Sequence, residues 1–166
     1  MSLSAITSWR RLGRACALIP LLAATACVQL PPPTDSVTIP PIPAGEARVW
    51  FYRPIDAYDS MATPYIRMNE AIVGVSQIGG ASYRDVVPGQ YLVTVDSYLT
   101  APEQTRNVYL FPGQQAYFKV LCLRNWIAGG GGRNDSGYQR DTFYVWQIPP
   151  EIAQGDVARS QFYGGG

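Results

Sequence analysis

The 166-residue sequence contains no histidine, and its only lysine is Lys119. Histidine is the usual general base of enzymes and the commonest protein ligand for metals. Its absence excludes catalytic triads built on a Ser–His or Cys–His pair, and it argues against a zinc site. We therefore expect a protein that is not an enzyme, without catalytic residues, cofactor or metal.

The sequence also lacks an apolar run long enough to cross a membrane. Residues 15–23 are apolar, but they fall short of the roughly 20 residues that a spanning helix needs, and Pro20 interrupts them. Arginines at 10, 11 and 14 precede this run, and the small residues 24–26 lead from it to Cys27. A cationic start, a short apolar segment and small residues are typical of a secretion signal.

The segment LAATAC, which ends at Cys27, resembles the lipobox of bacterial lipoproteins, in which the cysteine is acylated and becomes the mature N-terminus. On this resemblance, residues 1–26 are a lipoprotein signal peptide and Cys27 is the site of lipid attachment. Ala24 stands where the lipobox usually has leucine, and residues 24–26 also form an AxA site for ordinary signal peptidase. That alternative would release a soluble periplasmic protein. Because Val28 rather than aspartate follows the cysteine, the resemblance implies an outer-membrane, periplasm-facing lipoprotein.

Neither sign of charge dominates the part after residue 26, which holds ten basic and twelve acidic side chains. This balance gives no basic footprint for nucleic acid. Cysteine is scarce as well: Cys16 leaves with the signal peptide and a lipidated Cys27 cannot pair, so Cys122 has no disulfide partner. Cys122 shares one face of an alternating stretch with Phe118 and Val120, which predicts a small buried hydrophobe.

Proline is frequent between residues 27 and 45, where no helical period is present. We expect this segment to be the lipidated cysteine followed by an extended linker that acts as a stalk. The alternative is that this proline-rich segment is a docking motif for another protein. The sequence from 46 to 162 instead alternates with period two, which indicates strands, and residues 163–166 are expected to be a flexible glycine tail.

Turn signals divide this folded part into about seven or eight strands, which predicts an all-β fold, a single antiparallel β-sandwich. Asn69 and Glu70 lie between two strand-like runs and indicate a hairpin. Two Pro-Gly-Gln sequences, at 88–90 and 112–114, predict type II turns between adjacent strands. A last hairpin is expected from residue 115 to 147, and Pro149 and Pro150 predict a short C-terminal helix.

Several of these segments together resemble bacterial lipoproteins that carry the domain of unknown function 2846 (DUF2846). The resemblance implies a prealbumin-like or PEGA-like sandwich in the cell envelope, and it supplies no active-site residue because the family has no assigned activity. The matching motifs are ARVWFYRP (residues 47–54), MNEAIVG (68–74), VVPGQY (86–91), FPGQQAYFKV (111–120) and FYVWQIPPEIA (143–153).

The expected function is a non-catalytic binding or scaffolding module, whose partner is an envelope protein and whose anchor is membrane lipid. Exposed aromatic rings often anchor interfaces, and the candidates are Trp50, Tyr52, Tyr98, Trp126 and Tyr138. The alternative is binding of peptidoglycan or another glycan by the last loop, through Trp126, Asn134, Asp135 and Tyr138. The same loop contains the glycines 129–132, which we interpret as a loop rather than a phosphate cradle.

A pair of aspartates in one cleft could act as general acid and base, but nothing in their spacing along the sequence places two of them together. These aspartates are Asp56, Asp59, Asp85, Asp96 and Asp141. We expect them to form surface salt bridges with Arg48, Arg53, Arg84 and Arg124.

Overall fold

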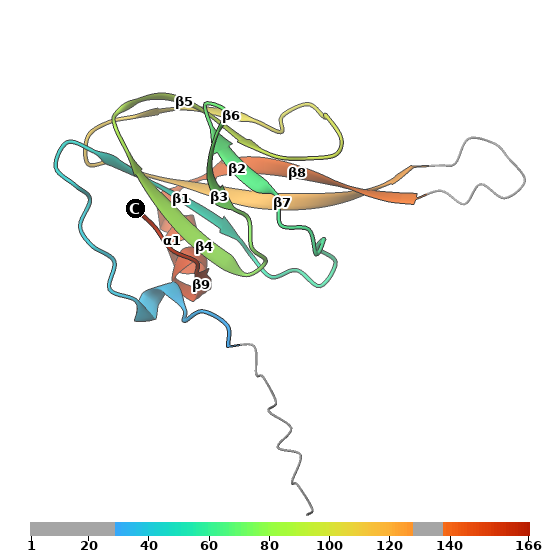
Figure 1. Ribbon diagram of the computed structural model, residues 1–166, viewed down its shortest axis with the longest axis horizontal. Coiled ribbons are helices and arrows are strands. Elements are labelled where there is room, and N and C mark those ends of the chain that lie inside the picture. The colour runs from blue at the N-terminus through green and yellow to red at the C-terminus, as the bar shows by residue number, and fades with distance from the viewer. Residues whose placement is uncertain (1–28, 128–137) are drawn as a thin grey trace, which may run out of the picture.

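A computed structural model of the chain describes residues 29–127 and 138–166, and the structural statements below concern this part. Nine strands and two helices lie within it (Figure 1). The strands are β1 (Ala47–Arg53), β2 (Tyr65–Met68), β3 (Ala71–Val75), β4 (Gly80–Val86), β5 (Gly89–Val95), β6 (Arg106–Leu110), β7 (Gln115–Ile127), β8 (Tyr138–Ile148) and β9 (Gln161–Phe162). The helices are the 3₁₀-helix η1 (Thr34–Ser36) and the α-helix α1 (Pro150–Arg159).

The strands form two sheets, as expected for an all-β sandwich. Sheet A has the order β8-β7-β1-β4-β9, and sheet B has the order β3-β2-β5-β6. Sheet B is antiparallel throughout, but in sheet A the pairs β1–β7 and β4–β9 are parallel. The prediction of a purely antiparallel sandwich is therefore wrong, and the expected seven or eight strands become nine through the two-residue β9.

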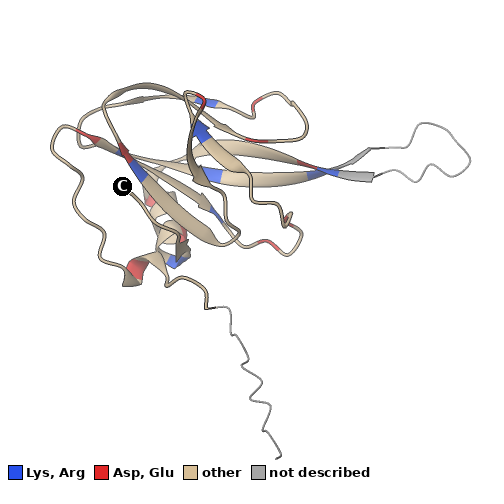
Figure 2. Cartoon of the chain, in the orientation of Figure 1, with Lys and Arg blue, Asp and Glu red and all other residues tan. Residues whose placement is uncertain are grey.

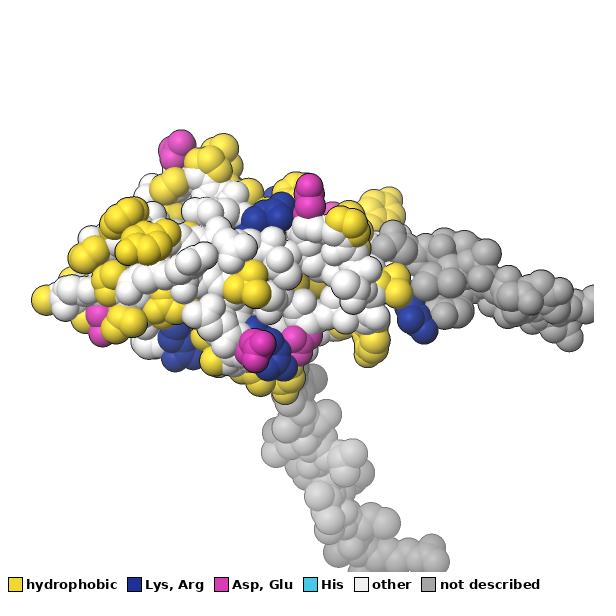
Figure 3. Space-filling model, turned by 90° about the horizontal axis from the view of Figure 1, so that it is seen from above, with side chains coloured by type: hydrophobic (Ala, Val, Ile, Leu, Met, Phe, Trp, Pro, Cys, Tyr) yellow, Lys and Arg dark blue, Asp and Glu magenta, His cyan; other side chains and the backbone are white. Residues whose placement is uncertain are grey.

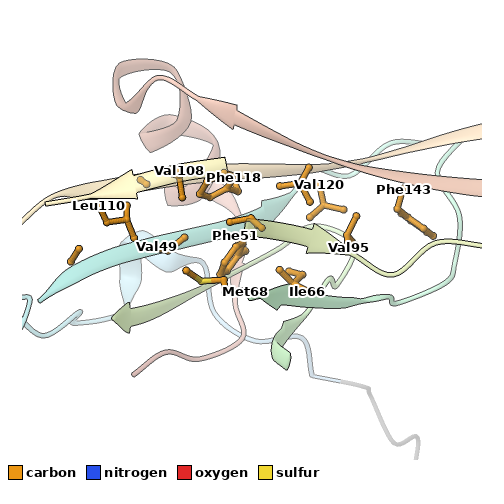
Figure 4. Close-up of a cluster of buried hydrophobic side chains, with 14 residues drawn as sticks. Val49, Phe51, Ile66, Met68, Val95, Val108, Leu110, Phe118, Val120 and Phe143 are labelled. Carbon is orange, nitrogen blue, oxygen red and sulfur yellow. The ribbon is translucent and has the colours of Figure 1, made fainter. Parts of the chain in front are cut away.

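The core between the sheets follows the period-two pattern of the sequence (Figure 4). Val49 and Phe51 of β1 face Ile66 and Met68 of β2 across it, and all four are at most 3% exposed. Each such side chain stabilises the fold by about 1.5–3 kcal/mol relative to an exposed position. Phe118 and Val120, which alternation placed on one face, are buried. Val93, Val95, Val108 and Leu110 are buried as well, and Tyr91 is partly buried against this core.

Helix α1 covers the opposite face of sheet A, so β1 is buried on both of its faces. The helix begins after Pro149 with Pro150 in its first turn, where a missing backbone N–H costs nothing. It buries Ala153 and Val157 against the aromatic residues of sheet A. The predicted short C-terminal helix is confirmed, with ten residues.

The two Pro-Gly-Gln sequences connect the sheets rather than neighbouring strands. The first leads from β4 in sheet A to β5 in sheet B, and the second leads from β6 back to β7. In the second, Gly113 has φ +74° and the Gln114 amide donates to the Phe111 carbonyl over 3.1 Å, as in a type II turn. The turn signal is therefore correct at this position, but the hairpins expected around both sequences are wrong.

Two other hairpins agree with the prediction. Asn69 and Glu70 connect β2 to β3 with φ values of +47° and +70°, the two left-handed positions of a type I′ turn. Strands β7 and β8 pair from Tyr117–Ile148 to Ile127–Tyr138, which is the last hairpin expected over residues 115–147.

Both terminal segments of the described chain are hydrogen-bonded to the sandwich. The carbonyl of Pro32 accepts from the Phe162 amide, and the Thr34 amide donates to the Ser160 carbonyl, each over 2.8 Å. The segment expected to be a stalk therefore joins the fold from Pro32 onwards. The tail expected to be flexible also packs on β4, because the Tyr83 amide donates to the Gly164 carbonyl over 3.2 Å.

Candidate functional site

Three segments meet at one end of the sandwich, which we call the loop end. They are residues 54–64 between β1 and β2, residues 96–105 between β5 and β6, and the hairpin of β7 and β8 (Figure 1). A pocket of about 330 Å³ opens there, within the range of small-ligand sites. Its lining residues are Ala62, Thr63, Pro64, Tyr65, Asp96, Ser97, Tyr98 and Phe143.

The pocket combines aromatic rings with oxygen-bearing side chains. Tyr65 is 48% exposed and Tyr98 is 79% exposed, whereas Phe143 is buried. Thr63, Asp96 and Ser97 supply hydroxyl and carboxylate groups beside these rings. Such a surface can hold a ligand with one apolar face and several polar substituents.

Asp96 is fixed as a carboxylate by Arg67 on β2. The Nε of Arg67 donates to one Asp96 oxygen over 2.7 Å, and Nη2 donates to the other over 3.1 Å. This charge-assisted pair lowers the pKa of Asp96 below the ordinary aspartate value. The pocket therefore presents a negative charge, held by two hydrogen bonds, at neutral pH.

A buried arginine lies beneath the pocket and fastens the loop of residues 54–64. Arg53 binds both carboxylate oxygens of Asp59, over 2.6 and 2.7 Å, and it donates to the carbonyls of Ser60 and Ala62. Its guanidinium carbon also lies 5.0 Å from the ring centre of Phe143. The loop is therefore held by a charged group at its base, which positions the pocket wall before any ligand arrives.

A second group of polar contacts ties the same loop to the β7–β8 hairpin. The Ser60 hydroxyl donates to a carboxylate oxygen of Asp141, and Arg124 lies 3.7 Å from the other oxygen. The Nη2 of Arg124 also donates to the Asp59 carbonyl. These contacts connect loop and hairpin into one unit.

The aspartates and arginines pair largely as the sequence suggested, but two pairs are buried rather than on the surface. In Arg48–Asp85 and Arg53–Asp59, all four side chains are less than 10% exposed. The hydrogen bonds that Arg48 donates to Asp85 raise the pKa of the Arg48 guanidinium, so Arg48 stays charged. Arg84 departs from the expectation, since it donates to the carbonyls of Val73 and Gly166 instead of a carboxylate.

Cys122 packs beside the core on the face that it shares with Phe118 and Val120, as predicted. Burial raises the pKa of its thiol to about 11. A thiol with this pKa is almost entirely protonated at neutral pH and is a poor nucleophile. This agrees with the interpretation of Cys122 as a packing residue.

Trp50 was predicted as a partner contact, and the structure contradicts this. Its ring is only 5% exposed and stacks on Tyr117, with centroids 6.4 Å apart, while Nε1 donates to the Gln115 side chain over 3.0 Å. Tyr52 is buried as well. Both residues lie under α1, whose coverage of this face the alternation of β1 does not reveal.

The structure describes only some of the other residues that the sequence suggested as partner contacts. Tyr98 is exposed in the pocket, as the sequence suggested. Trp126 and Tyr138 belong to β7 and β8, but their side chains lie outside the described part. Asn134, Asp135, the glycines 129–132 and the lipidation candidate Cys27 also lie outside the described residues. Tyr65 and the Arg67–Asp96 pair were missed, although alternation places Tyr65 and Arg67 on the outer face of β2.

Charged residues are interspersed over the described chain (Figure 2). Within residues 29–127 and 138–166, no three Cys, Asp or Glu side chains come together in a way that could hold a metal ion. None of the helices in these residues combines the length and the apolar character needed to cross a bilayer.

Comparison with protein-family models, with curated proteins and with solved structures gives no match to this chain. The resemblance to DUF2846 lipoproteins therefore stays a prediction from the sequence motifs.

Proposed function

We propose that this protein is a lipoprotein of the bacterial envelope, whose folded domain is a non-catalytic binding module. Its anchor is the acylated Cys27, and its location is the outer membrane, facing the periplasm. The order of cationic, apolar and small residues before Cys27 supports the anchor. The absence of histidine from the sequence supports a role in binding rather than catalysis.

The pocket at the loop end carries the proposal for binding. Two exposed tyrosines, Tyr65 and Tyr98, stand beside the fixed carboxylate of Asp96. The wall behind them is held by the buried Arg53–Asp59 pair, whose donors and acceptors are already engaged within the fold. The exposed groups of the pocket are therefore the ones available to a partner.

A glycan is the second, more specific candidate, and the chemistry of the pocket favours it. A sugar ring offers an apolar face that stacks on an aromatic side chain, and hydroxyls that donate to a carboxylate. Tyr98 and Asp96 supply these two functions side by side. An envelope protein that inserts an aromatic or proline residue would use the same tyrosines without needing the carboxylate.

Photocrosslinking in cells tests the binding role directly. A photoreactive phenylalanine analogue replaces Tyr98 in one strain and Tyr109 in another, because Tyr109 is 58% exposed on β6 and does not line the pocket. We expect a discrete adduct from position 98 and none from position 109. Identical patterns from both positions would contradict a binding site at the loop end.

Titration with a soluble disaccharide-peptide fragment of peptidoglycan separates the two ligand classes. We expect saturable binding that Tyr98→Ala weakens about three- to tenfold, the usual value of one aromatic contact. Asp96→Asn should also weaken it, whereas Tyr109→Ala should leave it unchanged. Absence of binding, together with a protein adduct in the crosslinking experiment, would favour the protein partner.

A further inference from the structure

The chain joins the fold very soon after the proposed lipid anchor. Pro32 is held by the Phe162 amide and Thr34 by Ser160, and Pro33 forms a bridge with Gln161. Only residues 28–31 separate Cys27 from this first fixed point. Even a fully extended chain covers about 18 Å over that interval, at about 3.6 Å per residue.

The fixed point lies on one particular side of the molecule. Residues 32–34 contact β9, the edge strand of sheet A, and the C-terminal end of α1. In Figure 1 these elements lie at the bottom of the molecule, on the opposite side from β5 and β6 of sheet B. We call the exposed part of η1 and α1, with Leu30, the anchor face. The opposite side of the molecule is the outer face of sheet B, where Tyr109 is exposed (Figure 3 views the molecule from this side).

The thickness of the fold decides which face can meet the membrane. Packed layers lie about 10 Å apart, so helix α1, sheet A and sheet B place the outer face of sheet B at least about 20 Å beyond the anchor face. A tether of about 18 Å is too short to wrap around this body. The outer face of sheet B therefore cannot reach the bilayer while residues 32–34 stay docked.

We propose that the anchor face is held against the lipid headgroups, and that the outer face of sheet B is turned away from the bilayer. This inference rests on the acylation of Cys27 in the proposed function. The occupant of the anchor face is the surface of the membrane that holds the lipid chains. The pocket at the loop end then opens at the side of the molecule, within a fixed short distance of the bilayer.

The charges of the anchor face argue against adhesion to the bilayer, so the proposal assigns the orientation to the tether. Asp35, Glu151 and Asp156 are acidic, and Arg159 is the only basic side chain among the residues of η1 and α1. Arg159 is bound to Asp156 over 2.8 Å. A face with this balance gains nothing from anionic headgroups. Leu30 and Ile152 are the two large hydrophobic residues exposed on the anchor face, and two are too few to insert as an amphipathic helix does.

Fluorescence quenching in vesicles tests the orientation. The full acylated protein, with Cys122→Ser, carries one fluorophore at Ile152→Cys or at Tyr109→Cys, positions with matched exposures of 62% and 58%. The proteins are placed in vesicles of phosphatidylethanolamine and phosphatidylglycerol that contain a headgroup nitroxide. We expect quenching at position 152 to exceed that at position 109 at least about twofold, because the tether limits the distance.

A longer tether supplies the matched control. Insertion of about 20 Gly and Ser residues between Val28 and Gln29 gives a flexible segment that can span the whole domain, so the quenching ratio should fall towards one. Equal quenching at the two positions with the native tether would overturn the orientation. A ratio that the insertion leaves unchanged would overturn the tether as its cause.

Flotation of the vesicles separates the proposed acylation from the proposed orientation. Protein missing from the floating fraction would overturn the acylation, and the orientation with it. Floating protein with equal quenching at the two positions would overturn the orientation alone.

Discussion

Arg53 is the largest fully buried side chain in the described part of the chain. A buried guanidinium is tolerated only when its charge is paired and its donors are satisfied. Asp59 supplies the charge, and the carbonyls of Ser60 and Ala62 take up further donors. The cost of burying this group makes the loop of residues 54–64 sensitive to any change in the pair.

Removal of the Asp59 carboxylate should be strongly destabilising. Asp59→Ala leaves the Arg53 charge buried without a partner, so we expect the free energy of unfolding to fall by about 3–5 kcal/mol. Asp96→Ala is the control, since its partner Arg67 is one-third exposed and water can solvate it. Urea denaturation of both variants checks the prediction. Equal losses for the two variants would contradict a special role for the buried pair.

The raised pKa of Cys122 predicts slow alkylation of the folded protein. The pKa moves from the ordinary 9.0 to about 11, so the reactive thiolate is rarer in the folded than in the unfolded chain. Modification by iodoacetamide at pH 8 should be at least about tenfold slower without urea than with it. Because folding favours the protonated thiol, its contribution to stability is present below pH 9 and is lost as the pH rises towards 11. Mass spectrometry of the Cys122 peptide measures the rate, and equal rates would show an open site.

Among the elements, the β2–β3 hairpin contains a strained residue. Glu70 occupies a left-handed position, φ +70°, that glycine adopts without the clash of a Cβ atom. We expect Glu70→Gly to raise the free energy of unfolding by about 0.5–1 kcal/mol. Glu70→Ala removes the charge but keeps the Cβ, so it should give no gain. Stabilisation by both variants would identify the charge, not the backbone, as the cause.

The edge of sheet A is protected by a loop from the other sheet. Strand β8 is an edge strand, and its backbone at Phe143 is bound on the open side by two side chains of the loop 96–105. The Ser97 hydroxyl accepts from the Phe143 amide, and Gln104 Nε2 donates to the Phe143 carbonyl, each over 3.1 Å. Covered edges are a common protection against pairing between molecules.

Loss of the Gln104 side chain should expose this edge. Gln104→Ala removes the bonds to Phe143, Leu99 and Ala101, and we expect a loss of about 1–3 kcal/mol in unfolding free energy. It should also produce self-association that increases with protein concentration. Light scattering of the variant and of Gln90→Ala, on the outer face of sheet B, checks this. A Gln104→Ala protein that stays monomeric at all concentrations would contradict the protective role.

For the whole molecule, the sequence predicted the strands better than their assembly. Alternation indicated the strands themselves and placed Phe118, Val120 and Cys122 on the core face of β7, because one apolar face per strand is a local signal. It did not show that α1 covers the second face of sheet A, so Trp50 was misassigned to the surface. The proline-glycine signals correctly marked chain reversals, but a turn has the same residues whether it joins neighbours or crosses between sheets.

The candidate site depends even more on assembly. Tyr65, Asp96 and Phe143 come from three separate segments that only the packing of the two sheets brings together. No spacing along the chain indicates such a pocket. The stalk expected over residues 27–45 was also wrong from Pro32 onwards, because proline-rich sequence predicts an extended backbone and not whether that backbone docks on the domain.

The central claim is that lipid chains on Cys27 fasten this domain to the envelope, and the intact mass of the native protein tests it most directly. The full chain is expressed in a bacterial host, the membrane fraction is extracted, and its mass is compared with that of Cys27→Ser. The account predicts a chain that begins at Cys27 and carries a diacylglyceryl group, with the variant left unprocessed. An unmodified chain that begins at residue 27 and appears in the soluble periplasmic fraction would contradict it.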